Sequence, residues 1–198
     1  MGLLVKQIML GKEMFCMLKY ILIFFFSILI NNANANNKEK IIDNLKNTYN
    51  LNFLFEQNIN GKIEKGNCVI EYPKKIFCEY SGSKSKVLIS NGKSLFIKTV
   101  SSYYRYPLNK TPLNLILNKK FLINKIQNSE ERIIDELYTN YTIIENDYEI
   151  NIFFDNQTLN LIGWQTKDIF QNLNITFLSA IKTNEKINKN IFKAPSQN

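Results

Sequence analysis

The chain has 198 residues, of which 45% are hydrophobic and 21% are charged, and this balance is typical of a globular protein rather than a disordered one. It contains 3 Cys and no His, which excludes Ser-His-Asp catalysis, Cys-His catalysis and any zinc site with His or four Cys ligands. The net charge of +8 comes from scattered Lys, with Arg only at Arg105 and Arg132. This distribution indicates a solvated surface rather than a nucleic-acid site.

The first 35 residues have the pattern of a secretory signal peptide. Lys19 precedes the apolar run Tyr20–Ile30, and the following NNANA places Ala33 and Ala35 two positions apart. We expect cleavage after Ala35, which leaves residues 36–198 as one domain outside the cytoplasm.

A membrane anchor is the alternative for this segment, but the apolar run is shorter than the roughly 20 residues of a bilayer-spanning helix. Residues 1–16 read as an upstream extension from a misplaced start. Cys16 lies before the apolar run, so we do not expect a lipidated Cys at its end.

Residues 37–49 predict an amphipathic helix. Ile41, Ile42, Leu45 and Tyr49 fall on one stripe of a helix with 3.6 residues per turn. That stripe must cover an apolar surface.

Beyond residue 50 the apolar period changes to two, which indicates strands. Turns are expected at Pro73 and at Asn91-Gly92, a dipeptide that favours a tight hairpin. The pattern of residues 130–137 fits a helix or a strand, and the strand that ends at Trp164 should exchange its faces near Gly163. The expected strands cover residues 51–58, 68–72, 76–80, 87–89, 95–97, 121–126, 148–154, 159–164 and 175–181.

Thr111-Pro112 predicts the start of a short helix that places Leu113, Ile116 and Leu117 on one side. Consecutive strands joined by tight turns indicate an antiparallel meander, and a sheet of this size must curl or pack on something. We therefore expect a mainly β fold in which short helices lie against the concave side of a curved sheet and enclose an apolar space.

Cys68 and Cys78 lie on adjacent expected strands and, by alternation, on the same face. Direct or diagonal opposition would suit a disulfide, and direct opposition needs a hairpin centred at Pro73. Export makes oxidation plausible. Two buried thiols are the alternative.

Six segments, in order along the domain, resemble the periplasmic outer-membrane lipoprotein carrier proteins, the LolA family, in its alphaproteobacterial form. Each segment alone is a weak signal, and their order behind a signal peptide is specific. They are FLFEQ (53–57), GNCVIEYP with FCEY (66–73 and 77–80), VLISNGKSLFI (87–97), YRYPLNKTPLNLIL (104–117), GWQTKD (163–168) and IFKAP (191–195).

The resemblance implies an unclosed antiparallel β-barrel with a helical lid over an apolar cavity. It also implies a monomeric periplasmic chaperone without enzymatic activity or cofactor, which takes acylated lipoproteins from an inner-membrane ABC exporter to an outer-membrane receptor. The candidate acyl-chain-binding residues are Cys68, Ile70, Tyr72, Ile76, Cys78, Tyr80, Val87, Ile89 and Trp164, with Leu113, Ile116 and Leu117 from the lid.

Tyr72 departs from the family pattern, because many carriers have an Arg there that bonds the lid. A Tyr hydroxyl can still donate a hydrogen bond but brings no charge, so the lid should be held less tightly or in a different way.

Three other functions are less consistent with the sequence. A lipid- or lipoprotein-sensing regulatory domain of related fold would be expected to continue beyond Ala194-Pro195, and the outer-membrane receptor would carry a lipidated Cys. An exported hydrolase is disfavoured because the available carboxylates show no catalytic spacing. Those carboxylates are Asp43, Glu56, Glu71, Glu79 and Asp168.

Overall fold

The chain divides after residue 36, and the second unit consists of residues 37–198. The expected signal peptide and Asp168 lie outside the residues that the structure describes. In this computed structural model the described residues are 37–82, 86–145, 148–167 and 172–196.

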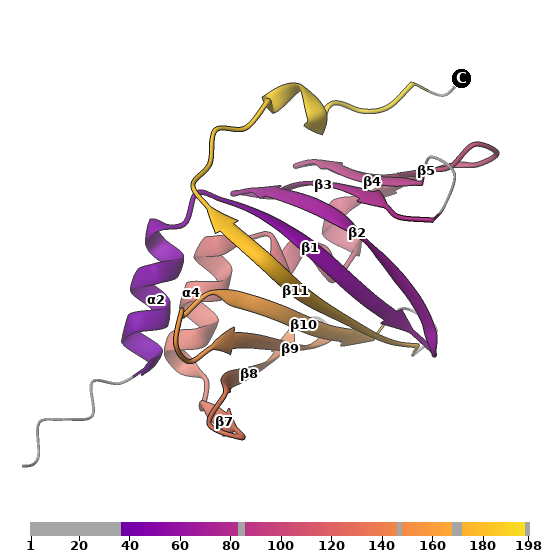
Figure 1. Cartoon of the computed structure of the whole chain (residues 1–198). Coiled ribbons are helices and arrows are strands. Elements are labelled where there is room, and N and C mark those ends of the chain that lie inside the picture. The colour runs from indigo at the N-terminus through magenta and orange to yellow at the C-terminus, as the bar shows by residue number, and fades with distance from the viewer. Residues whose placement is uncertain (1–36, 83–85, 146–147, 168–171, 197–198) are drawn as a thin grey trace, which may run out of the picture. The chain divides into compact units, whose positions relative to one another are not determined.

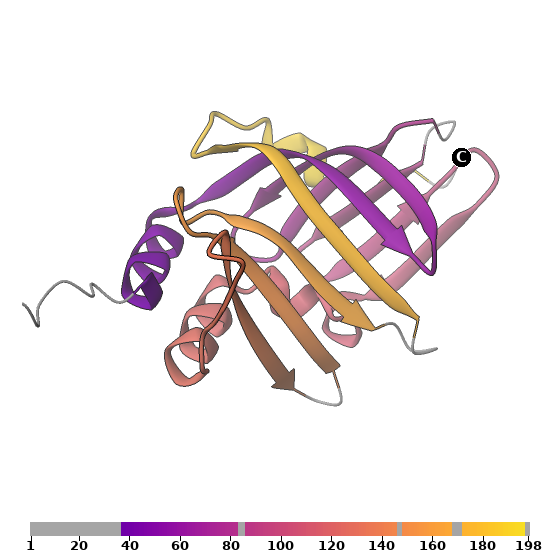
Figure 2. The ribbon, with the colours of Figure 1, turned by 60° about the horizontal axis from the view of Figure 1, so that its bottom comes forward.

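The second unit is built on one antiparallel sheet of eleven strands in the order β6-β5-β4-β3-β2-β1-β11-β10-β9-β8-β7. The edge strands β6 and β7 do not pair with each other, so the sheet curves without closing (Figure 1, Figure 2). This confirms the expected unclosed antiparallel architecture. The strands are β1 (Asn50–Ile59), β2 (Lys62–Glu71), β3 (Lys75–Tyr80), β4 (Val87–Asn91), β5 (Ser94–Lys98), β6 (Tyr103–Pro107), β7 (Arg132–Ile134), β8 (Tyr138–Glu145), β9 (Tyr148–Asp155), β10 (Leu161–Lys167) and β11 (Leu173–Thr183).

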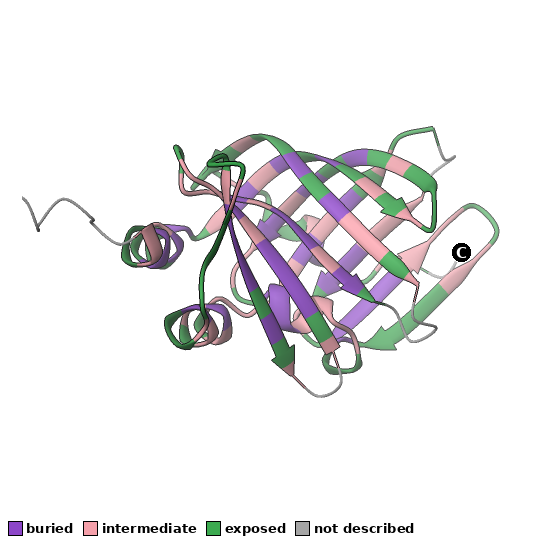
Figure 3. Ribbon diagram, turned by 90° about the horizontal axis from the view of Figure 1, so that it is seen from below, coloured by how far each residue is buried: buried purple, intermediate pink, exposed green. Residues whose placement is uncertain are grey.

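Alternation along the strands separates the two faces of the sheet. Leu51, Phe53 and Phe55 of β1 are buried, while the residues between them are more exposed, as the banding in Figure 3 shows. The Asn91-Gly92 turn joins β4 to β5 as expected, and Gly92 has a positive φ of 95° that suits a residue without a side chain. The predicted face exchange near Gly163 is also confirmed, because the β9–β10 register shifts between Leu161 and Gly163.

Short helices cover the concave face of the sheet. They are α2 (Asn37–Asn47), the 3₁₀ turn η2 (Leu108–Lys110), α3 (Leu113–Ile116) and α4 (Lys119–Asn128). The predicted N-terminal helix is confirmed, and α2 buries Ile41, Ile42 and Leu45. It ends at Asn47, however, so Tyr49 is not on its buried stripe and is 65% exposed.

The expectation of a strand at residues 121–126 is wrong, because this segment is part of α4. Leu122 and Ile126 are four residues apart and therefore share one helical face, where both are fully buried. The side chain of Asn118 accepts a hydrogen bond from the Phe121 N–H and caps the first turn. The ambiguous segment 130–137 contains the short strand β7.

The convex face is covered near β3 and β4 by the C-terminal 3₁₀ turn η3 (Lys189–Phe192), the yellow segment in Figure 1. Phe192 is buried there, and the ammonium of Lys75 lies 5.7 Å from the centre of its ring. Among the described residues, no helix is long and apolar enough to span a membrane.

Candidate functional site

An apolar cavity of about 190 Å³ lies between the concave face of the sheet and α3. Strands β1 to β5, β10 and β11 form its wall, and the segment from Thr111 to Ile116 covers it. Eleven apolar or aromatic side chains line it: Phe55, Cys68, Ile76, Cys78, Tyr80, Leu88, Leu95, Pro112, Leu113, Ile116 and Trp164.

Seven of the twelve side chains predicted to bind acyl chains line this cavity. The sheet brings them together from β2, β3, β10 and α3, although they are almost one hundred residues apart in the sequence. They are Cys68, Ile76, Cys78, Tyr80, Trp164, Leu113 and Ile116.

Three other predicted residues share the concave face but do not line the cavity. Ile70 and Leu117 are fully buried in the main core, and Tyr72 packs against that core. These three side chains belong to the packed core beside the cavity and are not part of the surface that lines it.

The structure corrects the placement of Val87 and Ile89. Leu88 pairs directly with Cys78 and lines the cavity, so its two neighbours on β4 point to the convex face. There Ile89 lies opposite Phe77 and Phe96. A shift of one residue in register exchanges the two faces, and the loop between β3 and β4 gave no pattern from which to fix that register.

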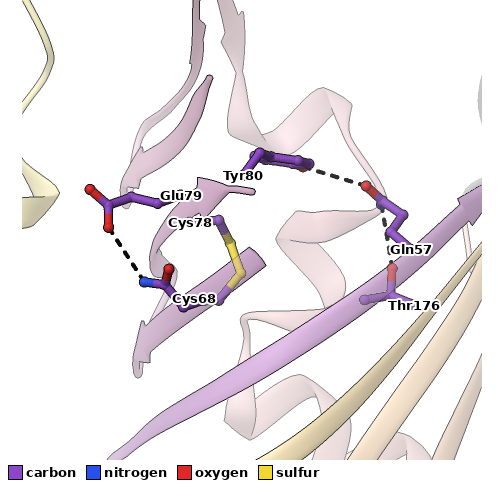
Figure 4. The surroundings of a disulfide bond; sticks show 7 residues. Gln57, Cys68, Cys78, Glu79, Tyr80 and Thr176 are labelled. Carbon is purple, nitrogen blue, oxygen red and sulfur yellow. Dashed lines mark hydrogen bonds between the residues drawn. A yellow bond between two sulfur atoms is a disulfide. The ribbon is translucent and has the colours of Figure 1, made fainter. Parts of the chain in front are cut away.

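Cys68 and Cys78 are directly opposite each other on β2 and β3, and they form a disulfide with a Cα–Cα distance of 4.1 Å (Figure 4). The hairpin is therefore centred at Pro73, as direct opposition requires. Because both sulfur atoms belong to the cavity wall, the bond ties these two strands together beside the site.

One end of the cavity carries polar side chains. Gln57 donates from Nε2 to Asn174 Oδ1 at 3.0 Å. It also donates to Thr176 Oγ1 at 3.4 Å, and its Oε1 accepts from the Tyr80 hydroxyl at 3.4 Å (Figure 4). These polar groups satisfy one another, so they do not need a ligand to complete their hydrogen bonds. The surface left for a ligand is the apolar part of the lining.

A charged cluster lies outside this polar end. Lys86 Nζ lies 4.0 Å from the centre of the Tyr80 ring and forms an ion pair with Glu64 at 2.5 Å, while Lys62 contacts the same carboxylate at 2.9 Å. Partial burial acts to raise the pKa of Glu64, but the hydrogen bonds from Lys86 and Lys62 outweigh it and hold that pKa below its usual value. Burial raises the pKa of Tyr80 well above its usual value, so its hydroxyl stays a neutral donor.

Lys119 connects α4 to the end of α2. Its Nζ donates to the backbone carbonyls of Lys46 and Thr48 at 2.8 and 2.9 Å. The same ammonium lies 5.1 Å from the ring centre of Tyr49 and 5.9 Å from that of Tyr72. These contacts cross-link the two helices, and nothing in the sequence pattern marked Lys119 for this role.

The Tyr72 hydroxyl does not hold the lid by a hydrogen bond. Its oxygen is buried and has no hydrogen-bond partner among the described residues. The same burial raises the pKa of Tyr72 far above its usual value. The positive charge at the end of α2 comes instead from Lys119 on α4, and not from position 72 at the β2–β3 hairpin.

The chemistry of the lining is that of a binding site. Its two Cys are bonded to each other, and Lys167 at the polar end is the ionisable amine among the residues that line it. The carboxylates of Asp43, Glu56 and Glu71 form ion pairs elsewhere on the surface, and neither they nor Glu79 line the cavity. Such a lining can shelter an apolar group.

An unclosed sheet with short helices over an apolar cavity is an arrangement suited to a hydrophobic ligand. Residues 47–195 match the family model described as outer membrane lipoprotein carrier protein LolA. Because this match covers most of the chain, the chain belongs to the LolA family, whose members are binding and carrier proteins.

Three solved structures are similar in fold. A LolA superfamily protein from Nitrosomonas europaea is 10% identical, with a TM-score of 0.41, and the match covers 81% of this chain and 99% of that chain. LprF from Mycobacterium bovis is 12% identical, with a TM-score of 0.43 and coverage of 77% and 94%. An uncharacterized conserved protein from Thermus thermophilus is 7% identical, with a TM-score of 0.49 and coverage of 82% and 96%. A comparison with curated protein sequences finds no match.

Proposed function

We propose that this protein is a periplasmic chaperone that shields the acyl chains of lipoproteins and carries them from an inner-membrane ABC exporter to an outer-membrane receptor. Exposure of each CH₂ group to water costs about 0.8 kcal/mol, so one long chain costs on the order of 10 kcal/mol. A carrier must cover that surface during transit and still release it.

The observation that carries this proposal is the apolar cavity beneath α3. Its walls are mainly aliphatic and aromatic, and at one end Gln57 forms hydrogen bonds with Tyr80, Asn174 and Thr176. α3 is a single turn of helix, and Leu113 within it is only partly buried although it faces the cavity. A cover this short has few contacts to break when a chain enters or leaves.

The contacts of Lys119 explain how α2 and α4 can stay in place while α3 opens. They attach α4 to α2 at a point away from the cavity lining. Opening would then involve α3 and the segment before it, while the core beneath α2 and α4 stays packed. The protein acts in this proposal as a monomer, with the exporter and the receptor as its successive partners.

Purification of the protein from the periplasm, followed by native mass spectrometry, tests the proposal. We expect the wild-type protein to carry acylated protein as bound mass. Leu113→Asp, which places a carboxylate in the cavity, should lose that mass, whereas Leu137→Asp at an exposed position should keep it. Wild-type protein that carries no acylated cargo contradicts the proposal, and bound free lipid without protein would favour the sensing function instead.

A further inference from the structure

The cavity is smaller than a site that holds a whole acyl chain. Its volume is about 190 Å³, whereas pockets for drug-sized ligands have roughly 300–1,000 Å³. If the protein binds acyl chains as proposed above, part of a long chain must therefore lie outside this cavity. The concave face of the sheet provides a surface that continues the apolar lining.

Such a surface follows the register of the sheet from the cavity to its edge. Cys78 pairs with Leu88, Leu88 with Ile97, and Ile97 with Tyr104 on the edge strand β6. Residues directly opposite each other share a face, so all four side chains lie on the concave side. Strands are about 4.8 Å apart, and the line therefore extends roughly 14 Å from Cys78 to the edge.

Two exposed aromatic side chains end this line. Tyr104 and Tyr106 are 51% and 45% exposed, and their rings stack with centroids 6.4 Å apart and an interplanar angle of 16°. Tyr106 lies opposite Leu95, which lines the cavity. The two tyrosines therefore extend the cavity wall, Tyr104 beyond Ile97 and Tyr106 beyond Leu95.

The charged residues of β5 and β6 point to the other face. Arg105 lies opposite Phe96 and donates from Nε to Ser94 Oγ at 3.2 Å, and its guanidinium lies 5.8 Å from the Phe96 ring. Lys98 alternates with Ile97 and is also directed to the convex side. The concave side of these two strands is therefore uncharged, which suits hydrocarbon and not a charged headgroup.

We propose that Leu88, Ile97, Tyr104 and Tyr106 form a second acyl-chain subsite, which holds the part of a long chain that the cavity cannot contain. Continuity with the cavity wall, the length of the line and the absence of charge on this face of β5 and β6 all favour an extended hydrocarbon chain as the occupant. Short chains fit within the cavity and do not reach the tyrosines. The subsite therefore sets a preference for chain length.

Titration of the purified protein with octanoic, dodecanoic and hexadecanoic acid tests this proposal. Trp164 is the one Trp of the chain and lines the cavity, so its fluorescence reports binding without a label. In the double variant Tyr104→Ser/Tyr106→Ser we expect the Kd for hexadecanoic acid to rise about tenfold. The Kd for octanoic acid should change less than twofold.

Phe177→Ser is the matched control, because Phe177 is 55% exposed on the convex face. It should leave both Kd values unchanged, and circular dichroism of each variant should match the wild type. Equal weakening of both acids, or an unchanged Kd for hexadecanoic acid in the double variant, overturns the subsite alone. A wild-type protein that binds none of the three acids contradicts both the subsite and the carrier function.

Discussion

The concave face of the sheet has two halves that share one sequence pattern and differ in how they are filled. Beneath α2 and α4 the side chains pack solidly, and Leu122, Ile126, Tyr141 and Ile150 have no exposed surface. Beneath α3 the wall side chains enclose a cavity, and residues such as Leu88 are only partly buried.

This difference separates core from site. Both halves alternate apolar and polar residues, so alternation identifies the concave face but does not show whether it is full. Two helices of about three turns supply side chains to one half, and a single turn supplies them to the other. The half with the shorter cover is the half that has room for a ligand.

The largest expected effect is on stability, in the filled half. Ile126→Ala should lower the free energy of unfolding by about 2–5 kcal/mol, because the surrounding side chains cannot collapse into the space. Leu88→Ala in the open half should cost less but weaken acyl-chain binding. Urea titration measures the first effect, with exposed Ile144→Ala as control. Equal losses of stability at both positions would remove the distinction between the halves.

The disulfide is expected to stabilise the open half, where packing contributes less. Cys68→Ala/Cys78→Ala should lower the free energy of unfolding by about 3 kcal/mol, because the unfolded chain without the bond has a higher conformational entropy. Intact mass should rise by two hydrogen atoms on reduction of the unfolded wild-type protein. If reductant leaves the mass unchanged, the two residues are thiols in the protein as purified.

Removal of the link between α4 and α2 should have a moderate effect. Lys119→Met breaks two hydrogen bonds to backbone carbonyls and should destabilise the protein by about 1 kcal/mol. Release of a bound fatty acid should become faster, because α4 is no longer attached to α2. Stopped-flow fluorescence of Trp164 measures this release. Lys120→Met is the control, and a variant at Lys119 that releases at the wild-type rate would show that α4 does not restrain the lid.

The smallest expected effect concerns pH. The pKa of Glu64 is lowered in the folded protein, so its contribution to stability is present above the unfolded pKa of about 4.3 and is lost as the pH falls through the folded value. Glu64→Gln should therefore flatten the decrease in stability on acidification below that value, by less than about 1 kcal/mol. Identical acid denaturation of the variant and the wild type would mean that the ion pairs with Lys86 and Lys62 contribute nothing.

Much of the fold could be predicted because local signals agree with it. The helix over Ile41 and Leu45, the hairpins at Pro73 and Asn91-Gly92, and the face exchange at Gly163 all depend on residues close in sequence. The cover formed by α3 also lies over the concave face as expected.

The errors come from contacts that sequence alone does not specify. Residues 121–126 have enough apolar side chains for a strand or a helix, and tertiary packing on α2 decides for the helix. Which side chains of β4 face the cavity depends on the register across the β3–β4 loop. A shift of one residue in that register separates the predicted position of Ile89 from that of Leu88, which pairs with Cys78. Lys119 donates to backbone carbonyls 73 and 71 residues away, and a backbone acceptor leaves no pattern in side-chain identity.

The central claim is that the open half beneath α3 shelters acyl chains, and photo-crosslinking tests it most directly. Hexadecanoic acid with a diazirine in its chain is bound, irradiated and mapped by peptide mass spectrometry. The account predicts saturable labelling within residues 55–57, 68–80, 86–98, 111–116, 164–167 and 174–176, which contain the residues that line the cavity. Labelling confined to α4 and β8–β9 in the filled half, or no saturable labelling at all, would contradict it.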